Sequence, residues 1–301
     1  MTLTMTKNTA MTPTIHHHIA SIREALHPKR SQHRIALVPT MGNLHDGHLQ
    51  LVKLARQHAD IVIVSIFVNP TQFGVGEDFD SYPRTLADDV MKLSGIGVDY
   101  VFAPTSEQMY PVLPPPTAIR AGAITAQLCG KTRPTHFDGV GIVVAKLFNI
   151  IQPDVAVFGQ KDYQQLAIIQ QLVRDLSYPI KIIGAPIVRA SDGLALSSRN
   201  QYLTDDERKI APLLRQELQL LAQQLVTAEL TLQAIEALLS KTHARLSDLG
   251  FIVDYLDIKA QDLTDIDDSQ RDATLQQERV ILAAAWLGRA RLLDNLVVTV
   301  H

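Results

Sequence analysis

The N-terminal two thirds of the chain alternate between short apolar runs and stretches in which apolar residues recur at helical spacing. The apolar runs are rich in Val, Ile and Phe, which is typical of buried parallel strands. They are Ile35 to Thr40, Asp60 to Val68, Asp99 to Pro104, Asp154 to Gly159 and Ile180 to Arg189. Helical spacing covers His48 to Ala59, Arg84 to Ser94, Val140 to Ile151 and Tyr163 to Ser177. This alternation predicts an α/β fold, a Rossmann-like parallel sheet with helices on both faces.

After Arg189 the pattern changes to helices followed by strands. Thr204 with Glu207 forms a capping box that predicts a helix running to about Val226. A second helix is predicted from Thr231 to Leu249, closed by Gly250, and the predicted strands are Phe251 to Ile258, Val280 to Trp286 and Ala290 to Val300. We therefore expect a Rossmann-like domain over residues 1–188 and a smaller α+β lid domain over 189–301. Residues 1–18, which include three consecutive histidines, read as a disordered tail.

Composition narrows the classes of protein and of partner. The 301 residues are 46% hydrophobic and 20% charged, which is typical of a folded globular protein. A formal charge of −3 gives no positive field to hold a nucleic acid. The longest apolar runs are far shorter than the roughly 20 residues of a membrane span. A single cysteine, Cys129, has no partner for an internal disulfide and suits the cytoplasm, where we place the protein.

The first chemical signal lies where the first predicted strand passes through a Gly-containing loop into a helix. His45 and His48 stand in the first turn of that helix, where backbone N–H groups and the helix dipole favour a phosphate. Both imidazoles can donate to phosphate oxygens, and Gly47 allows a ligand close to the backbone. The alternative is that Asp46 caps the helix and the histidines are solvated. A zinc pair is disfavoured because no third ligand has recognisable spacing.

The second signal is the loop Gly193 to Asn200, which holds two hydroxyls and a guanidinium. Ser197, Ser198 and Arg199 could together bind the oxygens of a phosphate, whereas alone they would read as a polar connection. Two further segments end predicted strands, Ser65 to Phe73 and Phe158 to Leu166.

The two signals together resemble the nucleotide signatures of the class I adenylyl-transferring superfamily. Residues 45–48 (HDGH) resemble its "HIGH"-like element and residues 196–200 (LSSRN) its "KMSKS"-like element. From about Ile35 to Asn295 the chain resembles the pantothenate synthetase family almost collinearly. The resemblance implies a ligase that joins D-pantoate to β-alanine. Pantoate attacks the α-phosphorus of Mg-ATP to form pantoyl adenylate and pyrophosphate, and the amine then displaces AMP to give pantothenate.

The resemblance also implies roles for individual residues. Those matching the family's ATP site are Thr40, Met41, Gly42, His45, Gly47, His48, Gly159, Lys161, Asp162, Val188, Leu196, Ser197, Ser198 and Arg199. Of these, His45, His48, Lys161, Ser197, Ser198 and Arg199 are the catalytic candidates. Gln72 and Gln165, with Asn69 beside them, match the pantoate site, and Tyr82, Arg133 and His136 match positions near it. No metal ligand is assigned, since Mg²⁺ is carried by ATP, and a homodimer is implied.

The chemistry is consistent with these residues. A carboxylate with a pKa near 4 is ionised at neutral pH, so adenylation needs alignment and relief of charge repulsion rather than a general base. The histidines, Lys161 and Arg199 would supply cations and donors. The alternative function is a related nucleotidyltransferase acting on another small acid or phosphate, which would not be expected to carry both glutamines. Asp88 and Asp89 read as the solvated face of a helix, with a role near Mg²⁺ as the alternative.

Overall fold

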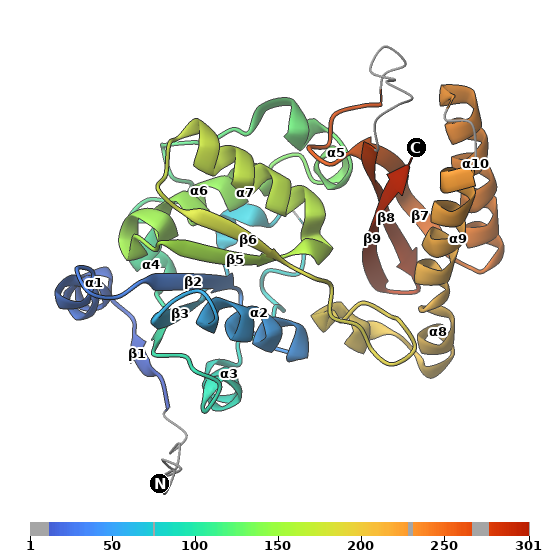
Figure 1. The fold of residues 1–301 in the computed structure, drawn as a ribbon. Helices are drawn as coiled ribbons and strands as arrows, with labels where there is room; N and C mark the ends of the chain where they lie inside the picture. Colours follow the sequence, from blue (N-terminus) through green and yellow to red (C-terminus); the bar gives the residue numbers. More distant parts are fainter. Residues whose placement is uncertain (1–11, 75, 228–230, 267–276, 301) are drawn as a thin grey trace, which may run out of the picture.

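Six parallel strands form the larger sheet, in the spatial order β1-β4-β3-β2-β5-β6 (Figure 1). The computed structural model describes residues 12–74, 76–227, 231–266 and 277–300. The strands are β1 (Thr14–His16), β2 (Ile35–Thr40), β3 (Ile61–Ile66), β4 (Tyr100–Phe102), β5 (Val155–Gly159) and β6 (Lys181–Ala185). The direction of winding reverses between β2 and β5, and such a reversal opens a ligand crevice at the carboxyl edge of a parallel sheet. The predicted Rossmann-like fold is confirmed.

Alternation along each strand supplies the two faces of this sheet. On β2, Leu37 packs among α1 (Ile19–Leu26), α6 (His136–Ile151) and α7 (Tyr163–Asp175). Its neighbour Val38 packs on the other side, against α2 (Asp46–Arg56) and α3 (Leu86–Leu93). Successive side chains of a strand point to opposite faces, so continuous apolar runs are needed where both faces are covered. The short helices α4 (Ser106–Met109) and α5 (Cys129–Thr132) lie in the connection from β4 to α6.

The C-terminal part is a three-stranded antiparallel sheet covered by helices. The strands are β7 (Ile252–Ala260), β8 (Gln277–Leu287) and β9 (Ala290–Val300), and the helices are α8 (Asp205–Ile210), α9 (Leu213–Thr227) and α10 (Leu232–Asp248). The capping box is present: Thr204 Oγ1 accepts from the Glu207 N–H at 3.3 Å. The prediction of one helix to Val226 is wrong, because the helix is interrupted at Pro212, which has no N–H and crowds the preceding turn.

The expectation of a disordered tail over residues 1–18 is also wrong from residue 12 onward; residues 1–11 lie outside the described part of the chain. Thr14, Ile15 and His16 form β1, which pairs in parallel with β4. His17 Nδ1 lies 2.7 Å from the carbonyl oxygen of Ala103, which fixes the next residue to the same edge. A three-residue strand has too short a pattern to be predicted from the sequence. Its partner strand is more than eighty residues away, so no local signal marks the pairing either.

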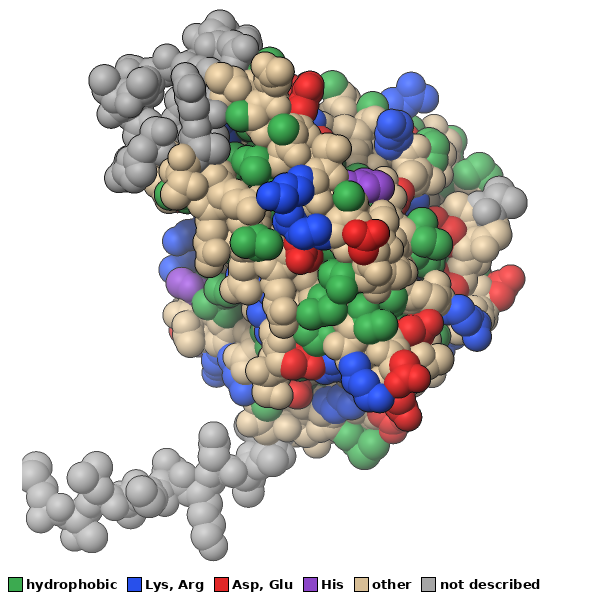
Figure 2. Space-filling view, turned by 90° about the vertical axis from the view of Figure 1, so that its right-hand side faces the viewer, with side chains coloured by type: hydrophobic (Ala, Val, Ile, Leu, Met, Phe, Trp, Pro, Cys, Tyr) green, Lys and Arg blue, Asp and Glu red, His purple; other side chains and the backbone are tan. Residues whose placement is uncertain are grey.

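The predicted domain boundary falls in the segment that leaves β6. Arg189 donates to both carboxylate oxygens of Asp294 on β9, at 2.6 and 2.8 Å, so this segment is fastened to the C-terminal sheet. The division at residue 188 stays a prediction. Figure 2 shows acidic and basic side chains interspersed on the face that includes the C-terminal part, without a field of one sign. Among the described helices, none is long and apolar enough to cross a membrane.

Candidate active site

A cavity of about 960 Å³ lies at the carboxyl edge of the parallel sheet, where the C-terminal part meets it. Its walls come from the ends of β2, β3 and β5, from the N-terminal turns of α2 and α6, and from β7, β8 and β9. All the ATP-site and pantoate-site residues that the sequence predicted line it except Gly42. The volume is at the upper end of the range for small-molecule sites and is sufficient for a nucleotide beside a small acid.

His45 and His48 form the N-terminal cap of α2. His45 is the N-cap residue: its Nδ1 accepts from the Gly47 N–H at 3.1 Å, and its own N–H donates to His48 Nδ1 at 3.3 Å. The alternative that Asp46 caps the helix is therefore wrong. Since each Nδ1 accepts a hydrogen bond, each neutral imidazole carries its proton on Nε2, which leaves that N–H to donate to a ligand. A side chain at Gly47 would meet the His45 ring at 2.7 Å.

Burial keeps both rings neutral at neutral pH. It lowers the pKa of His45 to about 4, with further lowering by the charge of Lys161. It lowers the pKa of His48 to about 3, with contributions from His45 and Lys161. At neutral pH the two histidines are thus available as the hydrogen-bond donors that the sequence predicted, and not as cations. An arriving polyphosphate would raise both pKa values, because opposite charge favours the protonated form.

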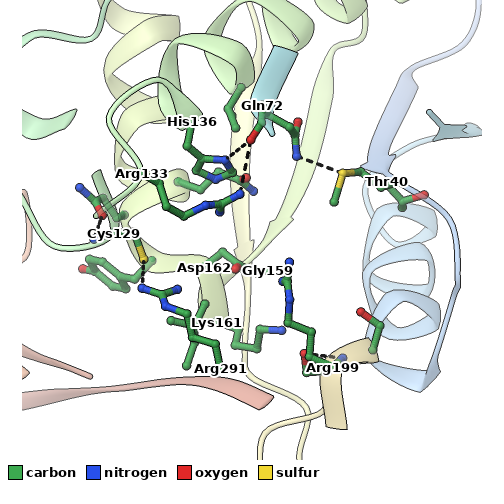
Figure 3. Close-up of a pocket in the computed structure, with 18 of the residues that line it drawn as sticks. Thr40, Gln72, Cys129, Arg133, His136, Gly159, Lys161, Asp162, Arg199 and Arg291 are labelled. Carbon is green, nitrogen blue, oxygen red and sulfur yellow. Dashed lines mark hydrogen bonds between the residues drawn. The ribbon is translucent and has the colours of Figure 1, made fainter. Parts of the chain in front are cut away.

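Lys161 belongs to a 3₁₀ turn, Gln160–Asp162, that directly follows β5. Its backbone is held from the C-terminal sheet: Asn295 Nδ2 donates to the carbonyl oxygens of Gln160 and Lys161, at 2.8 and 3.0 Å. The Lys161 ammonium lies 3.4 Å from the carbonyl oxygen of Leu196. Figure 3 shows Lys161 and Arg199 on neighbouring parts of the cavity wall. The fold thus places two cationic side chains from distant parts of the sequence on the same side of the cavity.

The loop of Ser197, Ser198 and Arg199 reaches the cavity from the connection to α8. Ser197 caps the 3₁₀ helix Ser198–Tyr202, accepting from the Arg199 N–H at 3.3 Å. The Arg199 guanidinium lies 3.6 Å from an oxygen of Asp78 and remains about one-third exposed. Burial raises the pKa of Tyr82, while the nearby Arg199 charge and a hydrogen bond with Ser198 oppose that rise. The loop therefore already contacts the opposite wall of the cavity.

The second wall is built around Gln72. Asn69, only 1% exposed, donates to Gln72 Oε1 at 3.0 Å and to the Gly139 carbonyl at 3.1 Å. Asn69 Oδ1 accepts from Thr71 and from Tyr110. Both ends of the Asn69 carboxamide are thus engaged, so it orients Gln72, whose Nε2 donates to Met41 Sδ at 3.0 Å (Figure 3).

The two neighbouring glutamines of α7 have different surroundings. Both line the cavity, and Gln165 is half-buried. Gln164 is buried: its Oε1 accepts from the Cys129 N–H at 3.0 Å, and its Nε2 donates to the Ile124 and Gln127 carbonyls. Gln164 therefore ties α5 to α7, and Gln165 is the glutamine whose surroundings suit a substrate.

Arg133 and His136 converge on the backbone of Gln72 (Figure 3). His136 Nδ1 donates to the Gln72 carbonyl at 2.8 Å, and Arg133 donates to the same oxygen at 3.4 Å. Burial and the Arg133 charge lower the pKa of His136 to about 4. Arg133 also forms a two-bond ion pair with Glu77, at 2.7 and 2.5 Å. That hydrogen bond to Arg133 holds the pKa of Glu77 below its usual value.

Several lining residues were not anticipated from the sequence. Arg291 of β9 binds Asp254 of β7 through two donors, at 3.0 and 2.5 Å, and lies 3.4 Å from Cys129 Sγ. The hydroxyl of Tyr255 lies 3.3 Å from the same sulfur. Cys129 is buried and begins the short helix α5. No sequence motif marks these residues, because Tyr255 and Arg291 are each more than a hundred residues from Cys129 in the chain.

Comparison with known proteins identifies the family. The model of the pantoate-beta-alanine ligase family matches residues 14–297. The chain belongs to that family. Within it, the pantothenate synthetase of Psychrobacter cryohalolentis is 69% identical over 289 residues, covering 96% of this chain and 99% of the relative. A crystal structure of pantothenate synthetase from Thermus thermophilus superposes with a TM-score of 0.83 at 41% identity, covering 94% of this chain and 98% of that one.

A further solved structure is that of the pantoate-beta-alanine ligase from Francisella tularensis, complexed with beta-gamma ATP and beta-alanine. It is 34% identical to this chain, with a TM-score of 0.75, and covers 95% of this chain and 97% of its own. The sequence-level resemblance to the ligase family is thus confirmed along nearly the whole chain. The role of each lining residue rests on geometry and remains a proposal.

Proposed function

We propose that the chain joins D-pantoate to β-alanine with consumption of ATP, releasing AMP and pyrophosphate through a pantoyl adenylate. The observation that carries this function is the meeting of two unlike walls in one cavity. One wall presents N–H donors and cations from His45, His48, Lys161 and Arg199. The other presents the carboxamides of Gln72 and Gln165. A polyphosphate suits the first wall and a small hydroxy acid the second.

In the first step the pantoate carboxylate attacks the α-phosphorus. A bond forms between a carboxylate oxygen and phosphorus, and the bond to the pyrophosphate oxygen breaks. Pantoate is already ionised at neutral pH, so no protein group has to remove a proton. The Nε2–H groups of His45 and His48, with Lys161 and Arg199, would stabilise the charge that accumulates on the departing pyrophosphate.

In the second step the amine of β-alanine attacks the acyl carbon, and the bond to the AMP oxygen breaks. The nitrogen loses a proton as the amide forms. Acyl adenylates hydrolyse readily, so the cavity must exclude water between the steps. The C-terminal part is the proposed lid: the Ser197–Asn200 loop and β9 already form one side of the cavity and would close further on the nucleotide.

Mg²⁺ enters this proposal with ATP. It supplies charge neutralisation on the phosphates when bound, and it prefers phosphate and carboxylate oxygens. Asp162 and Asp78 line the cavity next to Lys161 and Arg199 respectively, so carboxylate oxygens of the right type are present there. A carboxylate of either residue would supply an oxygen to the ion or to one of its waters.

We also propose a cytoplasmic homodimer. The dimer is supported by the family resemblance, and a cytoplasmic location by the unpaired thiol of Cys129 and by the use of ATP. Size-exclusion chromatography with light scattering of the purified full chain tests the dimer. A monomeric mass across the accessible concentrations would contradict it.

The decisive test of function measures pyrophosphate release from Mg-ATP with different acids. Pantoate alone should give a burst of one pyrophosphate per site, and β-alanine should convert the burst into continuous turnover with AMP and pantothenate as products. A hydroxy acid without the gem-dimethyl group serves as the control for acid selectivity. Continuous pyrophosphate release that requires a phosphorylated acceptor, with a nucleotide-linked product, would instead identify a nucleotidyltransferase.

A further inference from the structure

Asp89 is a buried carboxylate of α3 that accepts hydrogen bonds from the turn before α2 and from the N-cap of its own helix. The sequence placed Asp88 and Asp89 on a solvated helix face; for Asp89 this is wrong, because it is fully buried. Its Oδ1 accepts from the Leu44 N–H at 2.7 Å, and its Oδ2 accepts from the Asn43 N–H and the Thr85 hydroxyl, both at 3.0 Å. Two of these donors belong to the turn that leads into α2.

That turn has a backbone that needs support. Gly42 has φ of +84° and Asn43 has φ of +51°, so two consecutive residues are left-handed. A Cβ on Gly42 would lie 3.0 Å from Asp89 Oδ2, which shows how closely the carboxylate approaches the turn. Lys92, one helical turn beyond Asp89 on α3, donates to the Leu44 carbonyl at 2.7 Å. Helix α3 therefore binds both the N–H and the C=O of Leu44.

Leu44 directly precedes His45, the N-cap of α2. The His45 N–H in turn donates to His48 Nδ1. The orientation of both imidazoles therefore depends on the backbone of the turn that ends at Leu44. The Leu44 side chain is itself 2% exposed and packs in the core beside α3. A shift of the turn would move both Nε2–H donors together. Small displacements of donors are costly when the charge they serve is localised.

We propose that Asp89 and Lys92 are positioning residues for adenylyl transfer, which hold the Gly42–Leu44 turn so that His45 and His48 face the phosphates of ATP. Among the described residues that line the cavity, neither Asp89 nor Lys92 is found, so both act through the backbone rather than on substrate. The inference rests on the proposed function, since it names how the donors of that site are kept in place.

The first test compares Asp89→Asn with Asp88→Asn. Asp88 is the exposed neighbour on the same helix and serves as the matched control. Asparagine keeps the size of Asp89 but has one acceptor oxygen, so one backbone N–H of the turn faces an NH₂ group. We expect the rate of pantoyl adenylate formation at saturating substrates to fall by roughly 10- to 100-fold. The conversion of supplied pantoyl adenylate and β-alanine should be retained, and Asp88→Asn should match the wild type.

The second test removes only the contact to the Leu44 carbonyl. Lys92→Met keeps the aliphatic stem of an exposed side chain, and Lys53→Met on α2 is the control for loss of a surface charge. We expect Lys92→Met to slow adenylate formation selectively, by about 10-fold. Thermal melts of every variant accompany the rapid-quench measurements and decide whether Asp89→Asn is folded.

The outcomes separate the two levels of inference. If the wild-type chain shows no pantoate-dependent pyrophosphate release, the proposed function fails. If the wild type is active and Lys92→Met adenylates at the wild-type rate, the positioning role is wrong. It is also wrong if folded Asp89→Asn loses both half-reactions by the same factor, which would indicate a general structural effect. Selective loss of the first half-reaction in both variants supports it.

Discussion

Asn295 on β9 donates from its Nδ2 to the carbonyl oxygen of Lys161 at 3.0 Å. The same amide group donates to the Gln160 carbonyl at 2.8 Å, and Asn295 is only 6% exposed. The last strand of the chain thus fixes the turn that carries the lysine of the cavity. The C-terminal part contributes to the Lys161 side of the cavity through this contact as well as through its own side chains.

The contact between Asn295 and Lys161 gives the first prediction. Asn295→Ala removes the N–H groups that donate to the Gln160 and Lys161 carbonyls, so the turn after β5 should loosen. We expect kcat/KM for ATP to fall by roughly tenfold with little change in the KM of β-alanine. Steady-state kinetics against each substrate measures this, with Val297→Ala on the exposed face of the same strand as control. Unchanged ATP kinetics would show that Lys161 does not depend on β9.

A second prediction separates three glutamines. Gln72→Ala and Gln165→Ala should each raise the KM of pantoate more than that of ATP, since each removes hydrogen bonds to the acid worth roughly 2 kcal/mol. Gln164→Ala is the matched control, because Gln164 binds three backbone groups and stands beside Gln165 on α7. It should lower the melting temperature. Equal effects of Gln72→Ala on the two substrates would refute the pantoate assignment.

A third prediction concerns the imidazoles of α2. His45→Asn keeps an N-cap acceptor but removes the Nε2–H donor, which separates catalysis from helix capping. We expect pantoate-dependent exchange of pyrophosphate into ATP to fall by about 100- to 1,000-fold in His45→Asn and in His48→Ala. The transfer of supplied pantoyl adenylate to β-alanine should be largely retained, since the pyrophosphate has then left. Rapid-quench assays of both steps decide, and an equal fall in both would show that the histidines hold the adenylate or the fold.

The fourth prediction is a loss of stability in acid that arises from buried neutral histidines. The folded pKa is about 4 for His45, about 3 for His48 and about 4 for His136, all below the ordinary value of 6.5. Below pH 6.5 the unfolded chain therefore binds protons that the folded chain does not. The free energy of unfolding should fall as the pH is lowered from about 6.5 to about 4.

The same prediction can be tested with two histidine variants. His136→Gln removes one of the buried groups and keeps a donor for the Gln72 carbonyl, so it should make the pH dependence shallower. His33→Gln changes an exposed histidine and should follow the wild type. Urea unfolding at a series of pH values measures the slopes. Parallel curves for wild type and His136→Gln would contradict the buried-histidine origin.

The fifth prediction tests the proposed lid. Arg199 lies 3.6 Å from Asp78, a partly exposed ion pair that is easily exchanged for a phosphate. A non-hydrolysable analogue of pantoyl adenylate should therefore slow amide hydrogen exchange over Ser197 to Tyr202. Helix α10, which lies away from the cavity on the C-terminal sheet, serves as the internal reference. No change in exchange over the loop would rule out closure by this segment.

The sequence by itself determined most of the helices and strands, and it placed the candidate site motifs at strand ends and loops. Continuous apolar runs specify buried strands, and β2 begins and ends where its run does, at Ile35 and Thr40. The capping box at Thr204 was legible because its two partners stand three residues apart. The motifs around His45, Lys161 and Ser197 come after strands β2, β5 and β6 respectively. The parallel sheet brings the carboxyl ends of these strands to one edge. Such signals are local, so periodicity and spacing carry them.

Only the tertiary structure decided which polar side chains support that edge. Asp89 has the same sequence signature as its exposed neighbour Asp88, and only the packing of α3 against the turn before α2 buries it. Asn295 and Lys161 meet from positions more than a hundred residues apart. Strand β1 exists because β4 offers an edge to pair with. These contacts depend on how separate elements pack, and no local pattern records the partner of a hydrogen bond made across the fold.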